Sequence, residues 1–394
     1  MNLLRRRDGG ARVSNTELFF DLVYVVAVTQ LSAFVRLNPS WSGALQALLL
    51  LALAWNAWVY TTWVTNWLDP DRIPTRVMLL AVMSGSLVMS AGITDAFGEK
   101  GAWVGCAYAA IQVGRSAYTV WATRGTALRT NYQRILLWCL VSGALAIAGG
   151  FAPFRIRLVL FAAAVLVDVI GGILQFWVPV LGRSETRDWT IDGGHFAERC
   201  QAFLLIALGE SVVGVGSALI DAHRLSWLAV LGFGGAFVGV VCLFLLYFHR
   251  WAEAGVSAIT RTDDPGRLGR MFHFVHPVMI AGIILTAAGD EVVLEPLVVP
   301  DDHVNSGAYV AWLCAGGSAL FVIGLLLYIW LLTRAVSVAH VVAVVALLVL
   351  CFAGGTIPPL ATGILSGAVL LILFVVEVAR RSTPSPVAKA TDLA

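Results

Sequence analysis

Long apolar segments separated by short polar stretches dominate the hydrophobic pattern along the chain. A membrane-spanning helix requires about 20 predominantly apolar residues, and the chain provides that length repeatedly. Pro and Gly residues mark most of the breaks between the segments. The pattern predicts twelve spanning helices, at 16–36, 42–67, 75–96, 102–123, 133–151, 157–181, 195–219, 225–248, 271–292, 307–333, 338–355 and 358–379. We therefore expect an all-α, polytopic integral membrane protein.

The positions of Arg and Lys predict the orientation of this bundle, because cytoplasmic loops carry an excess of both. With a cytoplasmic N-terminus, nineteen of these residues fall in inside segments and five in outside loops. The five are Arg36, Lys100, Arg155, Arg157 and Arg224. An odd number of spans would remove this asymmetry. We therefore expect both termini to lie in the cytoplasm.

The two halves of the chain share features that indicate an internal repeat. Glu17 opens the first span and Glu198 holds the corresponding place in the seventh, while the third and ninth spans end at Asp95 and Asp290. Six spans per half is an even number, so both halves would have one orientation and be pseudo-symmetric about an axis along the membrane normal. The predicted organisation is a cytoplasmic basic tail at 1–14, a first six-helix half at 15–182, a cytoplasmic linker at 183–194, a second six-helix half at 195–380 and a cytoplasmic tail at 381–394.

Composition excludes several classes of function. The chain is 59% hydrophobic and 13% charged, and its net charge of +2 is too small to indicate a nucleic-acid partner. It holds no Gly-rich phosphate loop and no recognisable Ser/His/Asp arrangement, and its loops are too short to bind a nucleotide. The six cysteines fall inside predicted spans without metal-ligand spacing, as small buried hydrophobes do. The sequence predicts membrane lipids as partners and no cofactor.

The first span opens with two carboxylates on one helical face. Ser14 and Glu17 have the spacing of a capping box, which would explain Glu17 as a helix cap at the membrane edge. Asp21 lies one turn deeper, on the same face as Glu17, Tyr24 and Val28. Two ionised carboxylates at this spacing repel each other. Either one of them holds a proton, or a cation lies between them.

The span at 195–219 is the most unusual, because an ionisable side chain inside the bilayer costs at least a few kcal/mol. His195, Arg199 and Glu210 share one face, and Glu198 lies about 60° round from His195. Arg199 and Glu210 are roughly 16 Å apart along the axis, so they are not a direct pair. Glu210 is either a structural partner of another charge or a site that binds a proton or cation.

Arg115, in the span at 102–123, is the other Arg deep in a predicted membrane segment. A buried bridge from Arg115 to Glu210 or to Asp168 would satisfy the charges structurally. A different interpretation uses His273 and His276, which line one face of the ninth span. A metal there would need a further ligand, such as His195 or Glu198.

The motifs in the first and seventh spans resemble a known family. The segments Glu17-Leu-Phe-Phe-Asp-Leu-Val-Tyr-Val-Val-Ala-Val-Thr-Gln-Leu and His195-Phe-Ala-Glu-Arg, followed by Leu-Gly-Glu210-Ser, are similar to the two hallmark segments of the bacterial low temperature requirement protein A family. The resemblance extends from residue 13 to about residue 380. It implies a multi-pass protein of the bacterial cytoplasmic (inner) membrane, without a defined substrate or reaction. It also implies that the family signature includes Glu17, Asp21, His195, Glu198, Arg199 and Glu210.

The function that these features favour is a secondary transporter or permease-like protein for an unknown small molecule or ion. Asp21 and Glu210 would be proton or cation sites, and His195 and Arg199 a cytoplasmic gate or anion contact. The first and seventh spans would face each other across a central cavity. Alternatives are an intramembrane enzyme acting on lipid or isoprenoid, an ion channel, and a membrane sensor or assembly factor. The sequence does not determine the oligomeric state.

Overall fold

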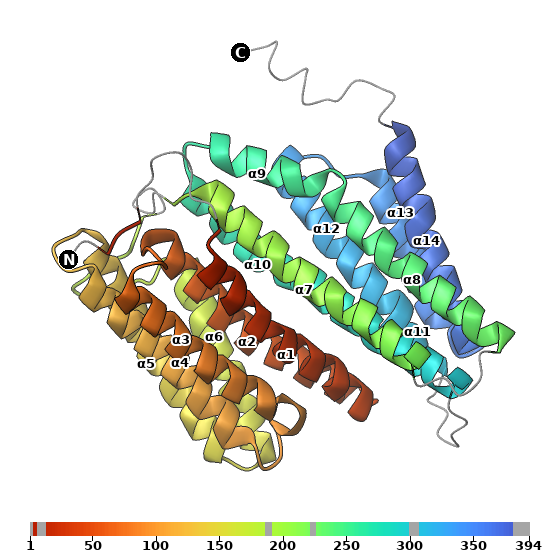
Figure 1. Cartoon of the computed structure of the whole chain (residues 1–394), viewed down its shortest axis with the longest axis horizontal. Helices are drawn as coiled ribbons and strands as arrows, with labels where there is room; N and C mark the ends of the chain where they lie inside the picture. The colour runs from red at the N-terminus through yellow and green to blue at the C-terminus, as the bar shows by residue number, and fades with distance from the viewer. Residues whose placement is uncertain (1–2, 6–12, 186–190, 221–225, 299–306, 381–394) are drawn as a thin grey trace, which may run out of the picture. The chain divides into compact units, whose positions relative to one another are not determined.

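The computed structural model describes residues 3–5, 13–185, 191–220, 226–298 and 307–380. Within these ranges the chain is helical, and its only β interactions are isolated bridges (Figure 1). The predicted cytoplasmic tail at 381–394 and most of the tail at 1–14 lie outside the described residues. A helix occupies each of the twelve predicted spans, so the all-α fold is confirmed.

Ten helical segments of the described chain are long and apolar enough to cross a membrane. The other two predicted spans fall short for different reasons. The helix at Val338–Ala353 has only 16 residues, and the helix at Gly101–Ala122 contains Gln112 and Arg115 among its interior residues. The chain is therefore a multi-pass helical membrane protein, and twelve spans is an approximate count.

The structure departs from the predicted spans most clearly at the end of the sixth and before the ninth. The span predicted at 157–181 ends as a helix at Ile173, and Gln175, Phe176 and Val180 have positive φ angles. Pro179 follows closely, and it can neither donate an amide proton nor continue the helix. An additional amphipathic helix, Trp251–Arg261, precedes the ninth predicted span.

The described chain forms two compact units, and each is considered by itself. Unit 1 comprises residues 1–206 and 256–273, and unit 2 comprises residues 207–255 and 274–394. Three helices contribute residues to both units: α7 (Gly193–Ile220), α9 (Trp251–Arg261) and α10 (Pro265–Val298). The predicted domain boundaries and the internal repeat stay predictions.

Unit 1 is a helical bundle arranged around α2. Its complete helices are α1 (Asn15–Leu37), α2 (Trp41–Trp67), α3 (Ile73–Gly92), η1 (Ile93–Asp95), α4 (Gly101–Ala122), α5 (Leu128–Phe151) and α6 (Phe154–Ile173) (Figure 1). Helix α2 packs against α1, α3, α4 and α6, and every residue from 53 to 62 is buried. Because α2 is enclosed on all sides, its polar side chains meet polar groups of the neighbouring helices. These polar contacts form the site described below.

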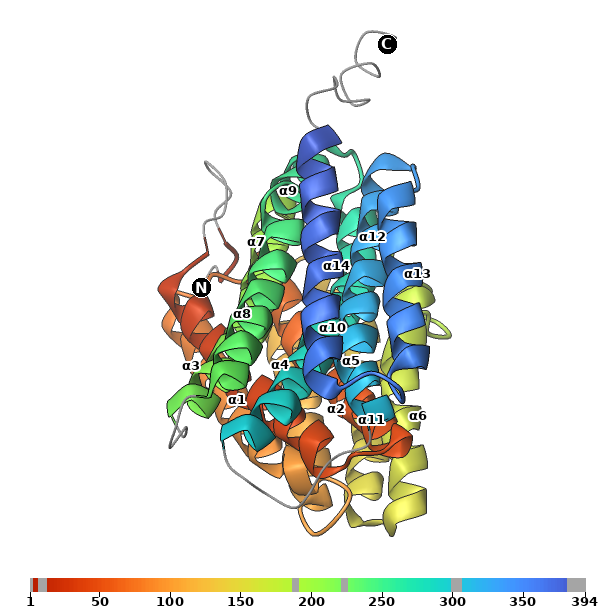
Figure 2. The same cartoon turned by 90° about the vertical axis from the view of Figure 1, so that its right-hand side faces the viewer.

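Unit 2 contains α8 (Trp227–Phe248), α11 (Gly307–Ala311), η3 (Trp312–Gly316), α12 (Gly317–Thr333), α13 (Val338–Ala353) and α14 (Pro359–Ala379) (Figure 2). Glycines at a spacing of seven residues allow α10 and α12 to approach backbone to backbone. A Cβ added at Gly282 would lie 2.7 Å from Gly317 O, and one added at Gly324 would lie 3.0 Å from Met279 N. Such close packing of small residues is how helices associate tightly in membranes.

The helix that pairs with α10 is irregular at one turn. Residues Trp312–Gly316 form a π-helical turn between α11 and α12, where each turn holds an extra residue. π-helical turns inside α-helices are rare and frequently accompany functional sites. In a membrane, irregular backbone is tolerated where it is buried in protein or lines a cavity.

Candidate functional site

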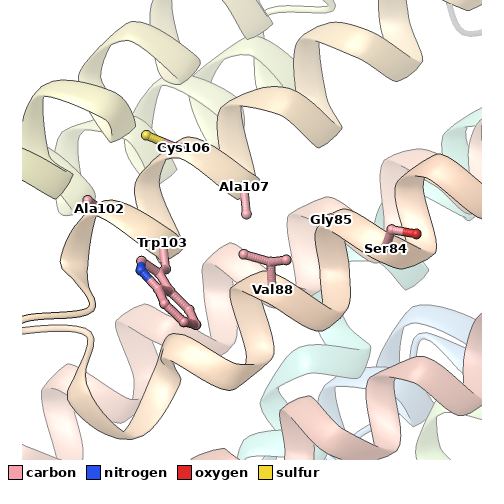
Figure 3. A pocket seen from close by; sticks show the side chains of 7 residues that line it. All are labelled: Ser84, Gly85, Val88, Ala102, Trp103, Cys106 and Ala107. Carbon is pink, nitrogen blue, oxygen red and sulfur yellow. The ribbon is translucent and has the colours of Figure 1, made fainter.

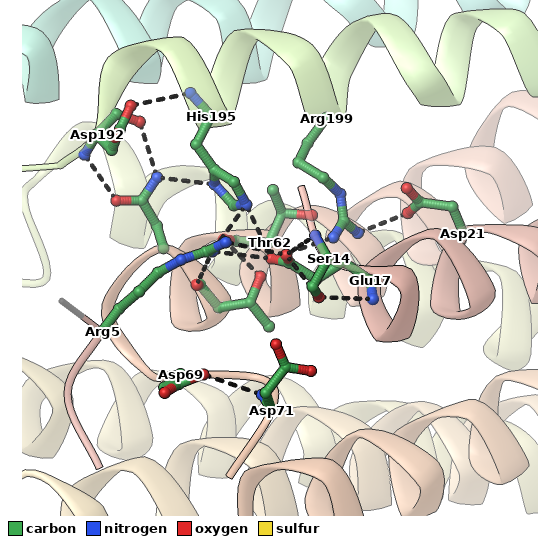
Figure 4. A network of polar contacts seen from close by, with 12 residues as sticks. Arg5, Ser14, Glu17, Asp21, Thr62, Asp69, Asp71, Asp192, His195 and Arg199 are labelled. Atoms are coloured by element: carbon green, nitrogen blue, oxygen red, sulfur yellow. Dashed lines mark hydrogen bonds and ion pairs between the residues drawn. The ribbon is translucent and has the colours of Figure 1, made fainter. Parts of the chain in front are cut away.

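The site begins with a carboxylate that is fixed at the start of α1. Ser14 and Glu17 form the predicted capping box: Glu17 N donates to Ser14 Oγ, and Glu17 Oε2 accepts from Ser14 N at 2.9 Å. Ser14 Oγ lies 3.0 Å from the same Oε2 atom. The cap therefore occupies one oxygen of Glu17 and directs the other toward α7 (Figure 4).

The second oxygen of Glu17 lies among three basic side chains. Its Oε1 atom is 2.9 Å from His195 Nε2, 3.3 Å from Arg5 Nη1 and 3.4 Å from Arg199 Nη1. The Glu17 side chain is 0% exposed. We call Arg5, Glu17, Asp21, His195 and Arg199 the ionic network. A buried carboxylate needs such compensation, because leaving water costs several kcal/mol.

Arg199 joins the two carboxylates of α1. Its Nη2 atom donates to Asp21 Oδ1 at 2.6 Å, while Nη1 lies 3.4 Å from Glu17 Oε1. Trp58 Nε1 of α2 donates to the same Asp21 oxygen at 2.7 Å. The guanidinium also lies over the rings of Phe20 and Trp58. Arg199 is therefore the cation that lies between the carboxylates of Glu17 and Asp21.

Asn66 of α2 fixes the orientation of the His195 ring. Asp192 N donates to Asn66 Oδ1 at 2.8 Å, and Asn66 Nδ2 donates to the Asp192 carbonyl at 2.9 Å. This pair of bonds determines which atom of the Asn66 amide is the nitrogen. That nitrogen, Nδ2, lies 3.2 Å from His195 Nδ1. Nδ1 therefore accepts from Asn66, and Nε2 carries the proton and donates it to Glu17 Oε1. In this tautomer the 3.0 Å approach of Arg5 Nη1 to Nε2 is a contact between two donors and not a hydrogen bond. With a neutral histidine, two arginines balance the two carboxylates.

Arg5 reaches the network because the chain before α1 pairs with the end of α2. Arg5 N donates to Trp67 O at 2.9 Å, and Asp69 N donates to Leu3 O at 2.9 Å. The Arg5 side chain also donates to Thr65 O at 3.0 Å. In the sequence, Arg5 belongs to a predicted basic tail, and no pattern indicates this role. Trp58 and Asn66 were likewise missed, because a buried polar position in a predicted span does not reveal its partner.

Three buried atoms of the network have no hydrogen-bond partner among the described residues. They are Asp21 Oδ2, Arg199 Nε and Arg199 Nη1, and the last of these makes only an ion-pair contact with Glu17 Oε1 at 3.4 Å. An unpaired buried polar atom costs about 1–3 kcal/mol, more when it carries charge. The free Asp21 oxygen is where the network can accept a proton or a small cation without losing an existing hydrogen bond.

A second buried polar cluster in unit 1 surrounds Arg115. Arg115 Nη1 donates to Ala57 O at 3.2 Å and to Thr61 Oγ1 at 3.3 Å, and Nη2 donates to Gln112 Oε1. Gln112 Nε2 then donates to Asp168 Oδ2 at 3.0 Å. The Gln112 amide thus bridges Arg115 and Asp168. The structure connects these two residues through this amide, whereas a direct ion pair was one interpretation of the sequence.

The structure separates the other predicted site residues from the ionic network. Glu198 is exposed on α7 and has no interaction recorded within the described chain. Glu210 lies further along α7, in unit 2, and is buried. The alternative pairing of Glu210 with Arg115 joins residues of different units and stays a prediction.

The histidines proposed for an intramembrane metal enzyme each have other neighbours within their own unit. His195 is bonded to Glu17, and His276 Nε2 of unit 2 lies 2.9 Å from Tyr247 Oη. His273 is buried beside the rings of Trp55 and Tyr60. The described residues hold no group of three or more His, Cys, Asp or Glu side chains able to hold a metal ion.

An apolar groove of about 720 Å³ lies between α3 and α4 (Figure 3). Its walls are Ser84, Gly85, Val88, Ala102, Trp103, Cys106 and Ala107. The Ser84 hydroxyl already donates to Leu80 O. No charged side chain lines the groove, so it offers nothing to bind a charged solute.

Helices of membrane length and a buried ionic network together define a polytopic α-helical membrane protein. The model of the family "Bacterial low temperature requirement A protein (LtrA)" matches residues 12–375. The chain belongs to this family. It is also 31% identical over 377 residues to a Rhizobium meliloti (strain 1021) protein named "Uncharacterized protein RA0937", covering 93% of this chain and 89% of the relative. No solved structure matches the chain.

Proposed function

We propose that the chain is a secondary transporter of the bacterial cytoplasmic membrane, with both termini in the cytoplasm. In this proposal the ionic network holds the start of α7 against α1 and releases it when a proton or cation binds. The observation that carries the proposal is Arg199, one buried cation bonded to Asp21 and paired with Glu17. The excess of Arg and Lys in the predicted inside loops supports the orientation.

The release of α7 from α1 would follow from the fact that Arg199 interacts with both Asp21 and Glu17. Asp21 Oδ1 already accepts from Arg199 and Trp58, whereas Oδ2 has no partner. A proton or cation on Oδ2 would neutralise Asp21 and weaken its attraction for the guanidinium. Arg199 would then be held by Glu17 alone, whose charge Arg5 already balances and whose Oε1 atom already accepts from His195. The start of α7 would lose its strongest attachment to α1.

An electrical measurement tests this function without a known substrate. Protein in liposomes on a solid-supported membrane would be exposed to a pH jump, or to a jump from choline to sodium. We expect a transient current from the native protein, and a reduction of about tenfold in Asp21→Asn, because an amide cannot gain a proton there.

Asp71→Asn is the matched control. Asp71 is an exposed carboxylate paired with Arg76 at 3.1 Å, so its neutralisation should leave the current unchanged. Equal currents from the native protein and Asp21→Asn would contradict the proposal. A correctly folded protein that gives no current with either ion would also contradict it.

A further inference from the structure

Asp290, on α10 of unit 2, is a buried carboxylate for which the described part of the chain shows no partner. Its exposure is 7%, and within the described residues the structure records no hydrogen bond or ion pair to its side chain. Apolar neighbours enclose this part of α10, with Ala287 and Ala288 buried before it and Val292 and Val293 after it. The carboxylate therefore lies in an apolar setting with no cation to compensate it.

This arrangement is costly for the protein alone. Removing a carboxylate from water without a hydrogen bond or counter-charge is far more expensive than burying a neutral polar group. In membrane segments such residues are rare and commonly mark ion or proton sites. The nearest like charge adds to the cost, because Glu291 adjoins Asp290 and repels it electrostatically. Both facts favour the arrival of positive charge at Asp290.

An irregular turn of backbone adjoins this part of α10. A Cβ added at Gly289 would lie 2.9 Å from Cys314 N, and one added at Gly317 would lie 2.6 Å from Thr286 N. The turn of α10 that carries Asp290 thus lies directly against the π-helical turn Trp312–Gly316. Interrupted helices in membrane transporters present backbone carbonyls that coordinate Na⁺.

Side chains around Asp290 define the charge of the site. Thr286 lies one turn earlier on the same side of α10, and its hydroxyl donates to Gly282 O at 2.9 Å. Glu291 points away, toward α7, where its Oε1 would lie 2.5 Å from a Cβ added at Gly214. The Cys314 thiol faces α10 beside Gly289. A single carboxylate with hydroxyl and carbonyl oxygens suits a small monovalent cation.

We propose that Asp290 and the π-helical turn Trp312–Gly316 form a binding site for a small monovalent cation, either a proton or Na⁺. The site belongs to unit 2 and uses none of the residues of the ionic network. Occupancy would neutralise Asp290 and tie α10 to the turn between α11 and α12. Binding at Asp290 does not require the release step proposed for unit 1.

Carbodiimide labelling of the full-length protein in detergent tests the proposal. Dicyclohexylcarbodiimide modifies protonated carboxyls in apolar surroundings, and peptide mass spectrometry locates the modified residue. In choline buffer we expect modification at Asp290 that increases as pH falls, and none at position 290 in Asp290→Asn. Protection by NaCl but not by choline chloride identifies Na⁺ as a ligand. Modification of Asp290 that depends on pH but not on NaCl identifies a proton site.

A stability measurement separates binding from a structural role. Asp290→Asn removes an uncompensated charge, so in sodium-free buffer its melting temperature should equal or exceed that of the native protein. For a sodium site, the native protein should gain stability with NaCl, Asp290→Asn should not, and Thr286→Val should need more NaCl.

Two results would overturn the site. One is an unmodified Asp290 at every pH in choline together with an unchanged melting temperature in NaCl. The other is a destabilised Asp290→Asn protein in sodium-free buffer, which would show that the carboxylate has a structural partner. Neither result depends on whether Asp21→Asn alters charge movement.

Discussion

At the scale of single residues, Arg199 determines how two carboxylates coexist on α1. It carries one positive charge, is 0% exposed, and reaches both Glu17 and Asp21. Breaking a buried ion pair from one side is strongly destabilising, by about 3–5 kcal/mol, because the other charge remains buried. Arg199 therefore contributes both to the stability of unit 1 and to the proposed switch.

A double-mutant cycle measures this coupling. Arg199→Gln should lower the free energy of unfolding by about 3–5 kcal/mol, because it leaves Asp21 without its cation. Arg199→Gln combined with Asp21→Asn should recover part of that loss, with a coupling energy of about 1–3 kcal/mol. Unfolding in mixed detergent micelles gives the four values. Additive effects of the two substitutions would show that the 2.6 Å contact contributes no net interaction.

Much of the residue-level site could be predicted from local sequence. The capping box of Ser14 and Glu17 and the shared face of Glu17 and Asp21 both follow from helical spacing, and the structure confirms them. The identity of the intervening cation could not be predicted, because Arg199 lies 178 positions from Asp21. Partners that distant in the chain leave no periodic signal.

At the scale of elements, polar residues inside apolar helices mark where helices meet. Helix α2 contacts α1 through Trp58, α4 through Ala57 and Thr61, and the start of α7 through Asn66. Hydropathy predicted α2 as a span but not its central position. Its low amphipathicity is the physical reason, since a helix enclosed on all sides has no distinct polar face.

Pro277 shows how the chain compensates for a local defect in α10. Proline has no amide proton, so the carbonyl four residues earlier loses its helical partner. That carbonyl belongs to His273, and Trp55 Nε1 of α2 donates to it at 2.9 Å. Trp55 thus satisfies the carbonyl that Pro277 leaves without a helical donor.

The backbone contact between α10 and α12 makes a testable element-scale prediction. Gly282→Ala should lower stability by about 1–3 kcal/mol, because the new methyl would lie 2.7 Å from Gly317 O. Gly363→Ala, in α14, is the matched control because open space surrounds that glycine. It should raise stability by about 0.5–1 kcal/mol. Thermal unfolding in detergent compares them, and equal effects would refute close packing at Gly282.

At the scale of the whole molecule, the hydrophobic pattern was sufficient to predict the fold class, and the predicted domain boundaries stay predictions. All twelve predicted spans are helical, yet α4 and α13 fall short of membrane length or hydropathy. The predicted boundary at 183–194 rests on the repeat, whereas the two compact units meet within α7, between Ile206 and Ala207. A continuous helix shared by two units leaves no break in hydropathy, so sequence alone could not reveal it.

The central claim is that α1 and the start of α7 separate when the ionic network is neutralised. Tyr24 of α1 and Phe203 of α7 lie side by side outside the network, with ring centroids 5.8 Å apart. In a background without native cysteines, Tyr24→Cys and Phe203→Cys would be joined by a short bifunctional methanethiosulfonate reagent, whose two disulfide bonds a reductant cleaves. As a control, Ser116→Cys with Cys139 retained would join α4 to α5, where these side chains already lie 3.6 Å apart.

The measurement that tests this claim most directly is the ion-induced current of the α1–α7 cross-linked protein on a solid-supported membrane. The account predicts that the cross-link abolishes the current, that a reductant restores it, and that the α4–α5 cross-link has no effect. A cross-linked protein with an undiminished current would contradict the account, because charge would then move without any separation of α1 from α7.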